Sequence, residues 1–511
     1  MLPKISKELN KTLGKEKEVQ YYRIILGNWL IHFIHQAYDK YRIIQEISKM
    51  GSINTFILDP EEHYFPFDFL DYNHKTETDI YQLQLFSEIV KYMGISYEIK
   101  KTKPLNSKIQ IKNKSWIQNY KKKILQLKDL FYKIFSTNEV VIVGPYFKKN
   151  KYLYELLLWF KSKGKISFDP FNYSPKYSIK KRDINFRNSF KIKSNNFEDW
   201  ILSFVMQNIP NAYLENHHEH INAVSNVYPT DKTKTFLTYN DLYHNTNFQF
   251  YIAQNYKKKK IYSAQHGCAY GMDLRHEGEE FEKSISDIFF TYGWIESSKT
   301  KPLPTPKIIG SRGSSHKKKI LFLTTTRTRY VQRFFQAPFS SKMLVDHVKN
   351  PITFLSNLNK IDEIFIRHHH IHDARGWNNR QRIIDRFPNI KEDPNISFYD
   401  SLNTCRLFIS DHFGTTFLEA LQSNTPSIIF INKSSYLFRK DFKPFVKKMI
   451  HFKILFYDPI EASIFVNSNE RNIIKWWFSD DLQKFRKEFI NKHALTSKKW
   501  KSVWCDSLLN S

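Results

Sequence analysis

The sequence has 511 residues, of which 41% are hydrophobic and 16% aromatic. This length exceeds what one ordinary hydrophobic core accommodates, so we expect two domains with additional helices, and the apolar content excludes global disorder. The formal net charge of +29 fits nucleic-acid binding, anionic lipid or a polyanionic substrate, and it also fits a genome-wide codon bias. The basic runs are short and scattered, and no RNP-type motif, Cys/His finger or continuous basic helix indicates a specific nucleic-acid reader.

Cysteine usage and the apolar runs indicate the compartment. Cys268, Cys405 and Cys505 lie far apart and form no CxxC pair, which fits a reducing compartment. The segment Met1–Gln20 is polar and rich in lysine, unlike a secretory signal, and the longest apolar runs are of strand length. We therefore expect a cytoplasmic protein whose basic surplus attaches it to the inner face of the cytoplasmic membrane.

The N-terminal half begins with helical patterns. Apolar residues recur at helical spacing from Tyr21 to Ile47, and a second helix is predicted at Gln82–Met93. Val140–Val143 is a buried strand that ends at a Gly-Pro turn. Strands and helices then alternate, which implies a parallel α/β sheet. These elements are a strand at Thr235–Thr238, a polar loop at Asn240–Asn247, a short helix at Phe248–Asn255, and strands at Lys260–Ala264 and Asp287–Tyr292.

The C-terminal half restarts the same pattern after a segment typical of a linker. Residues 301–319 contain three prolines, two glycines, serines and lysines. Beyond it we predict strands at Lys319–Leu323, Glu363–Ile366, Leu407–Ser410 and Ser427–Ile431, with a helix from Phe417 to Gln422. The predicted organisation is an N-terminal α/β domain with a helical extension at 1–300, a linker at 301–318, a Rossmann-like domain at 319–470, and helices at 471–511 that pack back on the protein.

The strongest motif begins at Asp411, where a buried strand leads through a Gly-Thr-Thr turn into a helix. Free N–H groups and the helix dipole favour an anion there, and the hydroxyls of Thr415 and Thr416 beside Gly414 add donors. Glu419 lies one turn further and could accept a hydrogen bond from a sugar hydroxyl, or pair with a lysine. The alternative is that Thr415 only caps the helix.

A second motif starts at Arg367 and contains four histidines, His369 among them. Arg367 suits a phosphate oxygen because a guanidinium forms bidentate hydrogen bonds. The histidines do not predict zinc, because adjacent residues of an extended chain point in opposite directions and no Glu or Cys completes a ligand spacing. Thr325, which follows the strand at Lys319–Leu323, is a further active-site candidate.

The third motif is Gln265-His266-Gly267, which follows the strand at Lys260–Ala264. Gly267 permits close approach of a ligand, and His266 can act as an acid, a base or a donor to phosphate. Cys268 is a poor candidate for a nucleophile beside His266, because adjacent residues rarely face each other. The sequence contains neither an Asp-x-Asp motif of metal-dependent glycosyltransferases nor a GxxxxGK loop.

Together these residues resemble a family of bacterial O-antigen and surface-carbohydrate transferases, which is itself similar to the retaining β-Kdo transferases. The resemblance covers nearly the whole chain in order. The matching stretches are Arg23–Leu30, Tyr243–Asn245 with Phe248, Gln265–Gly271, Ser286-Asp287 with Tyr292–Trp294, Asp373 with Gly376-Trp377, Arg406–Pro426, Trp476-Trp477 and Phe489–Trp500.

The resemblance implies a GT-B-like fold, in which two Rossmann-like domains face each other across a cleft, with extra N- and C-terminal helices. It implies a CMP-activated donor, with His266 at the active centre and Arg367, Thr415 and Thr416 holding the phosphate. Retaining β-Kdo transferases use an aspartate as nucleophile, and related sequences often read Tyr-His-Asn-Asp at the position where this chain has Thr246. Asp241 in the same loop is the substitute candidate for the catalytic carboxylate.

The sequence thus predicts a metal-independent glycosyltransferase of surface polysaccharide biosynthesis that transfers a sugar, with Kdo as a candidate, from a CMP-linked donor. The expected partners are the nucleotide sugar, a lipid-linked or oligosaccharide acceptor and the anionic membrane surface, without a cofactor or a specific nucleic acid. Two alternatives stay open: a polyol-phosphate transferase with a CDP-activated donor, and a non-catalytic basic protein that binds RNA or glycan.

Overall fold

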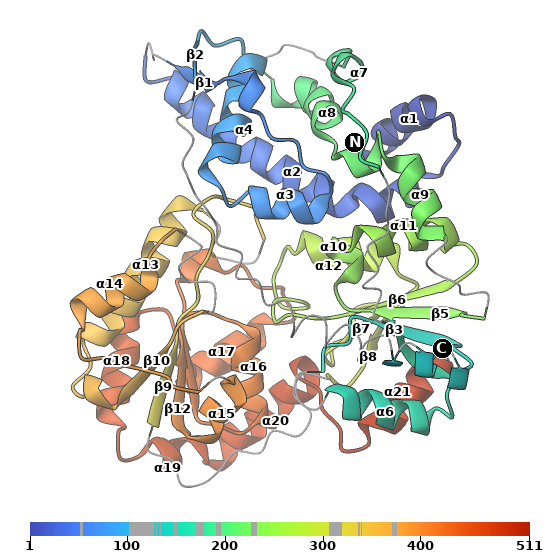
Figure 1. Ribbon diagram of the computed structural model, residues 1–511. Coiled ribbons are helices and arrows are strands. Elements are labelled where there is room, and N and C mark those ends of the chain that lie inside the picture. The colour runs from blue at the N-terminus through green and yellow to red at the C-terminus, as the bar shows by residue number, and fades with distance from the viewer. Residues whose placement is uncertain are drawn as a thin grey trace. The chain divides into compact units, whose positions relative to one another are not determined.

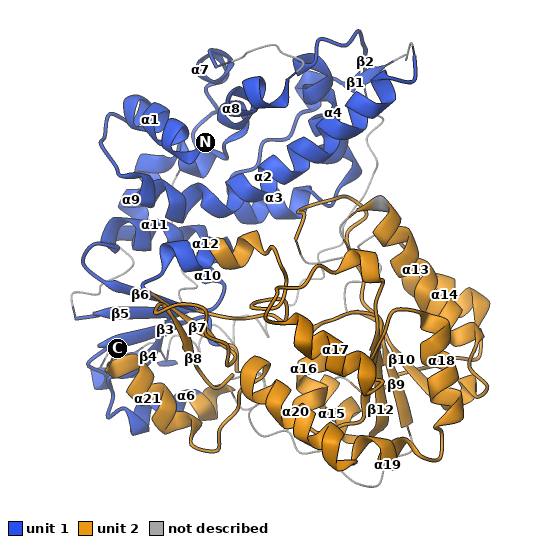
Figure 2. Cartoon of the chain, turned by 180° about the vertical axis from the view of Figure 1, so that it is seen from behind, with its two compact units in different colours: residues 1–145, 155–263, 281–287 blue, residues 146–154, 264–280, 288–511 orange. Residues whose placement is uncertain are grey.

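The structure is a computed structural model that describes residues 1–51, 55–101, 127–128, 130–132, 134–147, 151–169, 178–190, 196–225, 232–305, 319–335, 338, 340–369, 376–395 and 397–510. The chain forms two compact units (Figure 2). The first unit comprises residues 1–145, 155–263 and 281–287, and the second comprises residues 146–154, 264–280 and 288–511. Each unit therefore contains segments that are distant in sequence.

The first unit is rich in helices whose apolar faces form one core. Its long helix α2 (Val19–Ser48) packs on α1, α4, α8 and α11 through buried side chains such as Trp29 and Phe33. The helices that contribute are α1 (Leu2–Leu13), α3 (Phe69–Lys75), α4 (Asp79–Tyr92), α7 (Ile184–Asn188), α8 (Phe197–Asn208), α9 (His217–Ser225), α10 (Asp241–His244) and α11 (Thr246–Asn255). Strands β1 (Phe56–Leu58) and β2 (Glu98–Lys100) pair in parallel beside them.

One six-stranded sheet has the order β4-β3-β5-β6-β7-β8. Its strands are β3 (Val140–Val143), β4 (Ile166–Asp169), β5 (Thr235–Thr238), β6 (Lys260–Ala264), β7 (Ile288–Thr291) and β8 (Thr300–Pro302). Helices α6 (Lys151–Lys161) and α12 (Glu277–Ile285) join strands of this sheet. Numbered from β3, the order begins 2-1-3-4-5, that of flavodoxin-like sheets, and the strand order switches between β3 and β5.

The second six-stranded sheet has the order β11-β10-β9-β12-β13-β14, and its strand pairs are parallel. Its strands are β9 (Lys319–Leu323), β10 (Ile364–Arg367), β11 (Lys391–Glu392), β12 (Cys405–Ser410), β13 (Ser427–Phe430) and β14 (Leu455–Phe456). Numbered from β9, the order is 3-2-1-4-5-6, the Rossmann order, and the switch point lies between β9 and β12.

Helices cover both faces of this second sheet (Figure 1). Ile320 and Phe322 join one apolar cluster with α13, α14 and α18, whereas Leu321 and Leu323 join another with α16, α17 and α20. Successive side chains of a strand point to opposite faces, so a strand buried on both faces must be apolar throughout. The helices are α13 (Ser341–Ser356), α14 (Asn379–Arg386), α15 (Phe398–Asn403), α16 (Thr415–Gln422), α17 (Lys443–His451), α18 (Pro459–Ser468), α19 (Ile473–Trp477) and α20 (Asp480–His493). Helix α21 (Trp500–Leu509) instead packs Trp500 and Trp504 against Phe147.

The two parallel sheets and their helices confirm the predicted α/β class with two Rossmann-like sheets. The predicted strands are present to within two residues at either end, and the segment after Arg471 is helical as expected. The prediction of a polar loop at Asn240–Asn247 is wrong, because this segment contains α10 and the start of α11. The linker predicted at 301–318 begins inside β8, and residues 306–318 lie outside the described residues. Within the described part of the chain, every helix is too short or too polar to cross a membrane.

Candidate active site

The turn after β12 lies at the switch point of the second sheet. Ligands of open α/β sheets bind outside the carboxyl ends of the strands at this point, where the two flanking loops separate. Here the loop after β9 carries Thr324–Thr326 and the loop after β12 carries Asp411–Thr416. The carboxylate of Asp411 accepts hydrogen bonds from the Thr325 N–H at 3.0 and 3.2 Å, which joins the two loops.

Helix α16 presents its N-terminus at this turn. Gly414 is the N-cap residue and supplies no side-chain cap, and the first turn of the helix contains no acidic side chain. Among the described residues, the buried hydroxyls of Thr326 and Thr416 have no hydrogen-bond partner. Unsatisfied N–H groups and hydroxyls beside the positive end of a helix dipole favour an anion such as phosphate.

His412 belongs to the same turn. Its Nδ1 lies 3.0 Å from Asp411 Oδ1 and 3.0 Å from Ser410 Oγ. Its ring packs against Gly414 so closely that a Cβ at residue 414 would collide with it. A Cβ at residue 414 would force the His412 ring to move, and the imidazole Nε2 lies directly at the helix N-terminus, where it can bind an anion.

Arg367 ends β10 and takes part in an ion-pair network at the neighbouring edge of the sheet. Its Nη1 donates to Asp393 Oδ2 at 2.8 Å and to the Asn395 carbonyl at 2.7 Å, and Lys319 also pairs with Asp393. His369 follows two residues later and is partly buried. Its neighbours at 370–375 lie outside the described residues, and the binding of phosphate by Arg367 and His369 stays a prediction.

Glu419 is fully buried one turn into α16. Burial raises the pKa of Tyr399 above its usual range, and the nearby carboxylate of Glu419 raises it further. Glu419 also contributes, after burial, to the raised pKa of Tyr292. Its side chain therefore lies among tyrosines inside the unit, and a role in binding a sugar hydroxyl stays a prediction.

Gln265 is buried and fully engaged by the protein. Its Oε1 accepts hydrogen bonds from the Tyr292 N–H and the Trp294 indole, both at 2.9 Å, and its Nε2 donates to the Gly267 carbonyl at 2.8 Å. An amide with these partners joins the turn after β6 to the turn after β7 and shapes the loop that carries His266.

His266 lies in that loop between two tyrosines. The Tyr270 hydroxyl is 3.2 Å from its Nε2 and 3.4 Å from its Nδ1, and the Tyr146 ring lies 6.0 Å away between centroids. The imidazole is partly exposed, unlike the buried Gln265. These contacts orient the ring without burying it, as a group that contacts a substrate requires.

Asp241 belongs to the first unit and lies at the switch point between β3 and β5. Its carboxylate packs against Gly144, which follows β3 with a φ of 59°, and a Cβ at residue 144 would collide with Oδ2. Its backbone N–H donates to Thr238 Oγ1 at 3.2 Å, and Asn245 Nδ2 donates to its Oδ1 at 3.4 Å. The strand order thus places this carboxylate where α/β sheets bind ligands.

The N-terminal motif supports the Asp241 loop. Gly27 permits α2 to approach Phe281, and the Asn28 side chain donates to the Tyr243 carbonyl at 2.6 Å. His32 Nε2 lies 3.2 Å from the Tyr243 hydroxyl. Thr246, where the resemblance led us to expect an aspartate, is buried and its hydroxyl hydrogen-bonds the Asp68 carboxylate, whose pKa burial raises. Thr246 is thus a structural residue here.

Two charged residues of the second unit were missed by the sequence analysis. Arg327 lies in the loop after β9, and Asp273 lies two residues beyond Gly271. Burial and, after it, the Glu279 carboxylate raise the pKa of Asp273 to about 7, against the opposing effects of Arg327 and Arg439. The sequence could have indicated these two residues only by their position, because each lies just beyond a motif that follows a strand.

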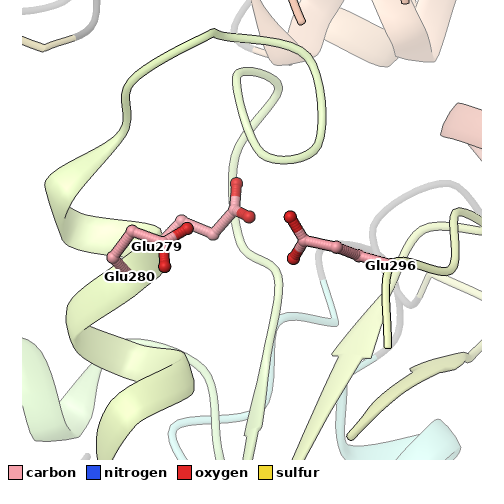
Figure 3. A group of neighbouring side chains, drawn as sticks. All are labelled: Glu279, Glu280 and Glu296. Atoms are coloured by element: carbon pink, nitrogen blue, oxygen red, sulfur yellow. The ribbon is translucent and has the colours of Figure 1, made fainter. Parts of the chain in front are cut away.

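Three carboxylates near Asp273 form an acidic group, Glu279 and Glu280 on α12 with Glu296 opposite (Figure 3). Arg439 lies among them: its Nη2 is 2.7 Å from Glu279 and 3.8 Å from Glu280, and its Nη1 is 3.1 Å from Glu296. Glu279 Oε2 also accepts the Gly271 N–H at 2.9 Å. The single guanidinium bridges the three carboxylates and offsets part of their negative charge.

The chain resembles several solved structures at low identity. It is 6% identical to MurG of Acinetobacter baumannii, with a TM-score of 0.35, over 73% of this chain and 99% of that chain. It is 9% identical to the glycosyltransferase SnogD of Streptomyces nogalater (TM-score 0.36; 72% and 99%). It is 11% identical to UDP-GlcNAc 2-epimerase of Methanocaldococcus jannaschii (TM-score 0.35; 73% and 99%). No curated protein matches the chain.

One family model extends over almost the complete sequence. The model of the LIC12162 family transferase matches residues 1–508. Since this match includes both sheets and the helical tail, the chain belongs to the LIC12162 family of transferases.

Proposed function

We propose that the protein is a glycosyltransferase that binds the phosphate of a nucleotide-activated sugar at the Gly414–Thr416 turn. The observation that carries this proposal is the uncapped N-terminus of α16 at the switch point of a Rossmann-ordered sheet. Membership of a transferase family supports a group-transfer reaction. The buried hydroxyls of Thr326 and Thr416 supply further donors for the phosphate oxygens.

The finer proposal concerns the donor and the pathway. We propose a CMP-linked donor, with Kdo as the candidate sugar, and a role in the synthesis of bacterial surface polysaccharide. The resemblance of the Gln265–Gly271 and Arg406–Pro426 stretches to surface-carbohydrate transferases supports this choice. Polyol-phosphate transfer from a CDP-linked donor is the competing reaction, and a nucleotide panel distinguishes the two.

In the proposed reaction an acceptor hydroxyl attacks the anomeric carbon, and the bond from that carbon to the phosphate oxygen breaks with CMP as the leaving group. The α16 N–H groups, Thr415 and Thr416 stabilise the negative charge that develops on the phosphate. Arg367 and Arg327 are the candidate cations. His266 donates a hydrogen bond to the developing charge or to the sugar carboxylate, and Asp241 is the predicted nucleophile or base.

A thermal-shift panel with CMP, CDP, UDP and GDP tests the proposed function. A ligand at about 100 times its dissociation constant stabilises the folded state by roughly 2.7 kcal/mol, which raises the melting temperature measurably. We expect the largest shift with CMP. A larger shift with CDP favours the polyol-phosphate reaction, and no shift with any nucleotide, combined with salt-sensitive RNA binding, contradicts the proposal.

Turnover is expected to survive EDTA. The proposed phosphate ligands are N–H groups, hydroxyls and guanidinium groups, which supply the positive charge that Mg²⁺ provides in Asp-x-Asp enzymes. The measurement is the rate of CMP release before and after chelation. Complete loss of turnover that Mg²⁺ or Mn²⁺ restores would show that a metal performs this role.

The protein is expected to bind vesicles that contain anionic lipid more strongly than neutral vesicles. Each well-placed Lys or Arg contributes about 1 kcal/mol near an anionic surface, and the net charge is +29. Sedimentation with phosphatidylglycerol and phosphatidylcholine vesicles at two salt concentrations measures the difference. Equal binding to both vesicles would mean that the charge reflects composition alone.

A further inference from the structure

The backbone of residues 269–274 is held in place from three sides. Asp273 forms an antiparallel bridge with Phe438, with hydrogen bonds from Arg439 N to the Met272 carbonyl (2.9 Å) and from Leu274 N to the Leu437 carbonyl (2.7 Å). Glu279 accepts the Gly271 N–H, and Gly271, with a φ of 69°, packs on Trp294 without room for a Cβ. The position of Asp273 is therefore strongly constrained.

The bridge places Asp273 next to the candidate phosphate turn. The ring of Phe438, its bridge partner, packs edge-on against Phe413 at 6.0 Å, and Phe413 lies between His412 and Gly414. The Phe413 N–H donates to the Tyr436 hydroxyl at 3.3 Å. Burial raises the pKa of Tyr436 above its usual range, Arg327 opposes this, and the carboxylates of Asp273 and Asp411 add to it. Asp273 therefore lies close to the loops that carry Arg327 and Phe413.

The groups that face the Asp273 carboxyl come from three segments of the chain. Arg327 follows β9, Glu279 belongs to α12, and Arg439 and Tyr436 belong to the segment before α17. Arg439 also donates from Nε to the Asp273 carbonyl at 3.0 Å. Burial and the Glu279 carboxylate raise the pKa of the Asp273 carboxyl to about 7, although the guanidinium groups of Arg327 and Arg439 lower it.

Glycosyl transfer requires one proton to move. The phosphate leaves as an anion that the helix N-terminus and the cations stabilise, so it needs no proton. The acceptor hydroxyl, in contrast, must lose its proton as its oxygen forms the new bond to the anomeric carbon. A base for this step is most effective when its pKa lies near the working pH and when it lies close to the donor site.

We propose that Asp273 is the general base that takes the proton of the acceptor hydroxyl. This inference rests on the proposed glycosyltransferase function and names a catalytic residue for it. As the acceptor oxygen bonds to the anomeric carbon, its O–H bond breaks, the proton passes to an Asp273 carboxylate oxygen, and the carbon–phosphate oxygen bond breaks with its electrons on the phosphate. The same role applies to the second step of a double displacement, in which the acceptor attacks a glycosyl-enzyme.

Release of CMP from CMP-Kdo, with water as the acceptor and the rate without protein subtracted, tests this assignment. In the wild type, kcat/KM should rise with pH through a limb near pH 7, because Asp273 acts as a base only when ionised. Asp273→Asn should lower the rate by about 10²- to 10⁴-fold and abolish the limb. Its affinity for CMP, measured by isothermal titration, should stay within about threefold of wild type, because the nucleotide ligands remain.

Glu280→Gln is the matched control, because Glu280 is an exposed carboxylate in the same segment. It should keep the limb and the wild-type rate. An Asp273→Asn variant that retains the limb, or that loses CMP affinity in parallel with turnover, overturns the assignment. A wild-type protein that binds no nucleotide and releases no CMP overturns the proposed function itself, which is a different result from a defect confined to Asp273→Asn.

Discussion

Arg327→Ala is expected to weaken the binding of CMP by about 10- to 150-fold. The guanidinium lies in the loop after β9, at the switch point of the second sheet. Its positive charge lowers the pKa values of Asp273, Tyr436 and His347, so these groups lie near it. A hydrogen bond to a charged group contributes about 1.5–3 kcal/mol, which corresponds to this change in dissociation constant. Isothermal titration of CMP into the wild type and the variant measures it.

Two further arginine variants make this result specific. Arg471→Ala removes an exposed arginine of the same unit and should leave CMP affinity unchanged. Arg367→Ala tests the ligand predicted from sequence: it should also weaken CMP binding, and it should lower the melting temperature, since Arg367 pairs with the buried Asp393. An Arg327→Ala protein that is folded and binds CMP as the wild type does would remove Arg327 from the site.

His266→Ala is expected to reduce turnover by about 10²- to 10³-fold while CMP affinity stays within about threefold. A donor directed at charge that develops in the transition state acts on kcat rather than on ground-state binding. The imidazole is oriented by Tyr270 and lies beside Tyr146, yet it remains partly exposed. Steady-state kinetics of CMP release combined with isothermal titration separates the two effects.

The matched control for this variant is His451→Ala, which removes an exposed histidine at the end of α17. It should leave both kcat and CMP affinity at wild-type values. Tyr270→Phe should give a smaller loss of turnover than His266→Ala, since it removes only the hydroxyl next to the ring. If His266→Ala lowers CMP affinity as much as turnover, His266 acts in binding or folding and not in the chemical step.

The fold was predictable where burial dictates composition. Strands β3, β9 and β12 are buried on both faces, so their apolar runs and the turns that follow are visible in the sequence. Helix α10 was not predictable, because four residues do not complete the spacing that reveals an amphipathic helix. The two-residue strands β11 and β14 are likewise too short to show a pattern.

The site was predictable only in part. Positions directly after strands could be identified, since the carboxyl ends of parallel strands carry ligands, and this reasoning predicted Thr325 and Thr415, which lie at the switch point of the second sheet. The same reasoning could not show that the Gln265 side chain is hydrogen-bonded to Tyr292 and Trp294, because those contacts join separate turns. Asp273 was not predicted as a site residue, because its position depends on an isolated β-bridge to Phe438, which is distant in sequence. Contacts of this kind leave no periodic signal in the sequence.

A crystal structure of the protein with CMP bound tests the central claim most directly, because it locates the phosphate. We expect a phosphate at the N-terminus of α16, within hydrogen-bond distance of the Thr415 and Thr416 N–H groups, with the Thr416 hydroxyl and the Arg327 guanidinium as further donors. A nucleotide bound instead at Gly144 and Asp241, or at a site away from both switch points, would contradict it.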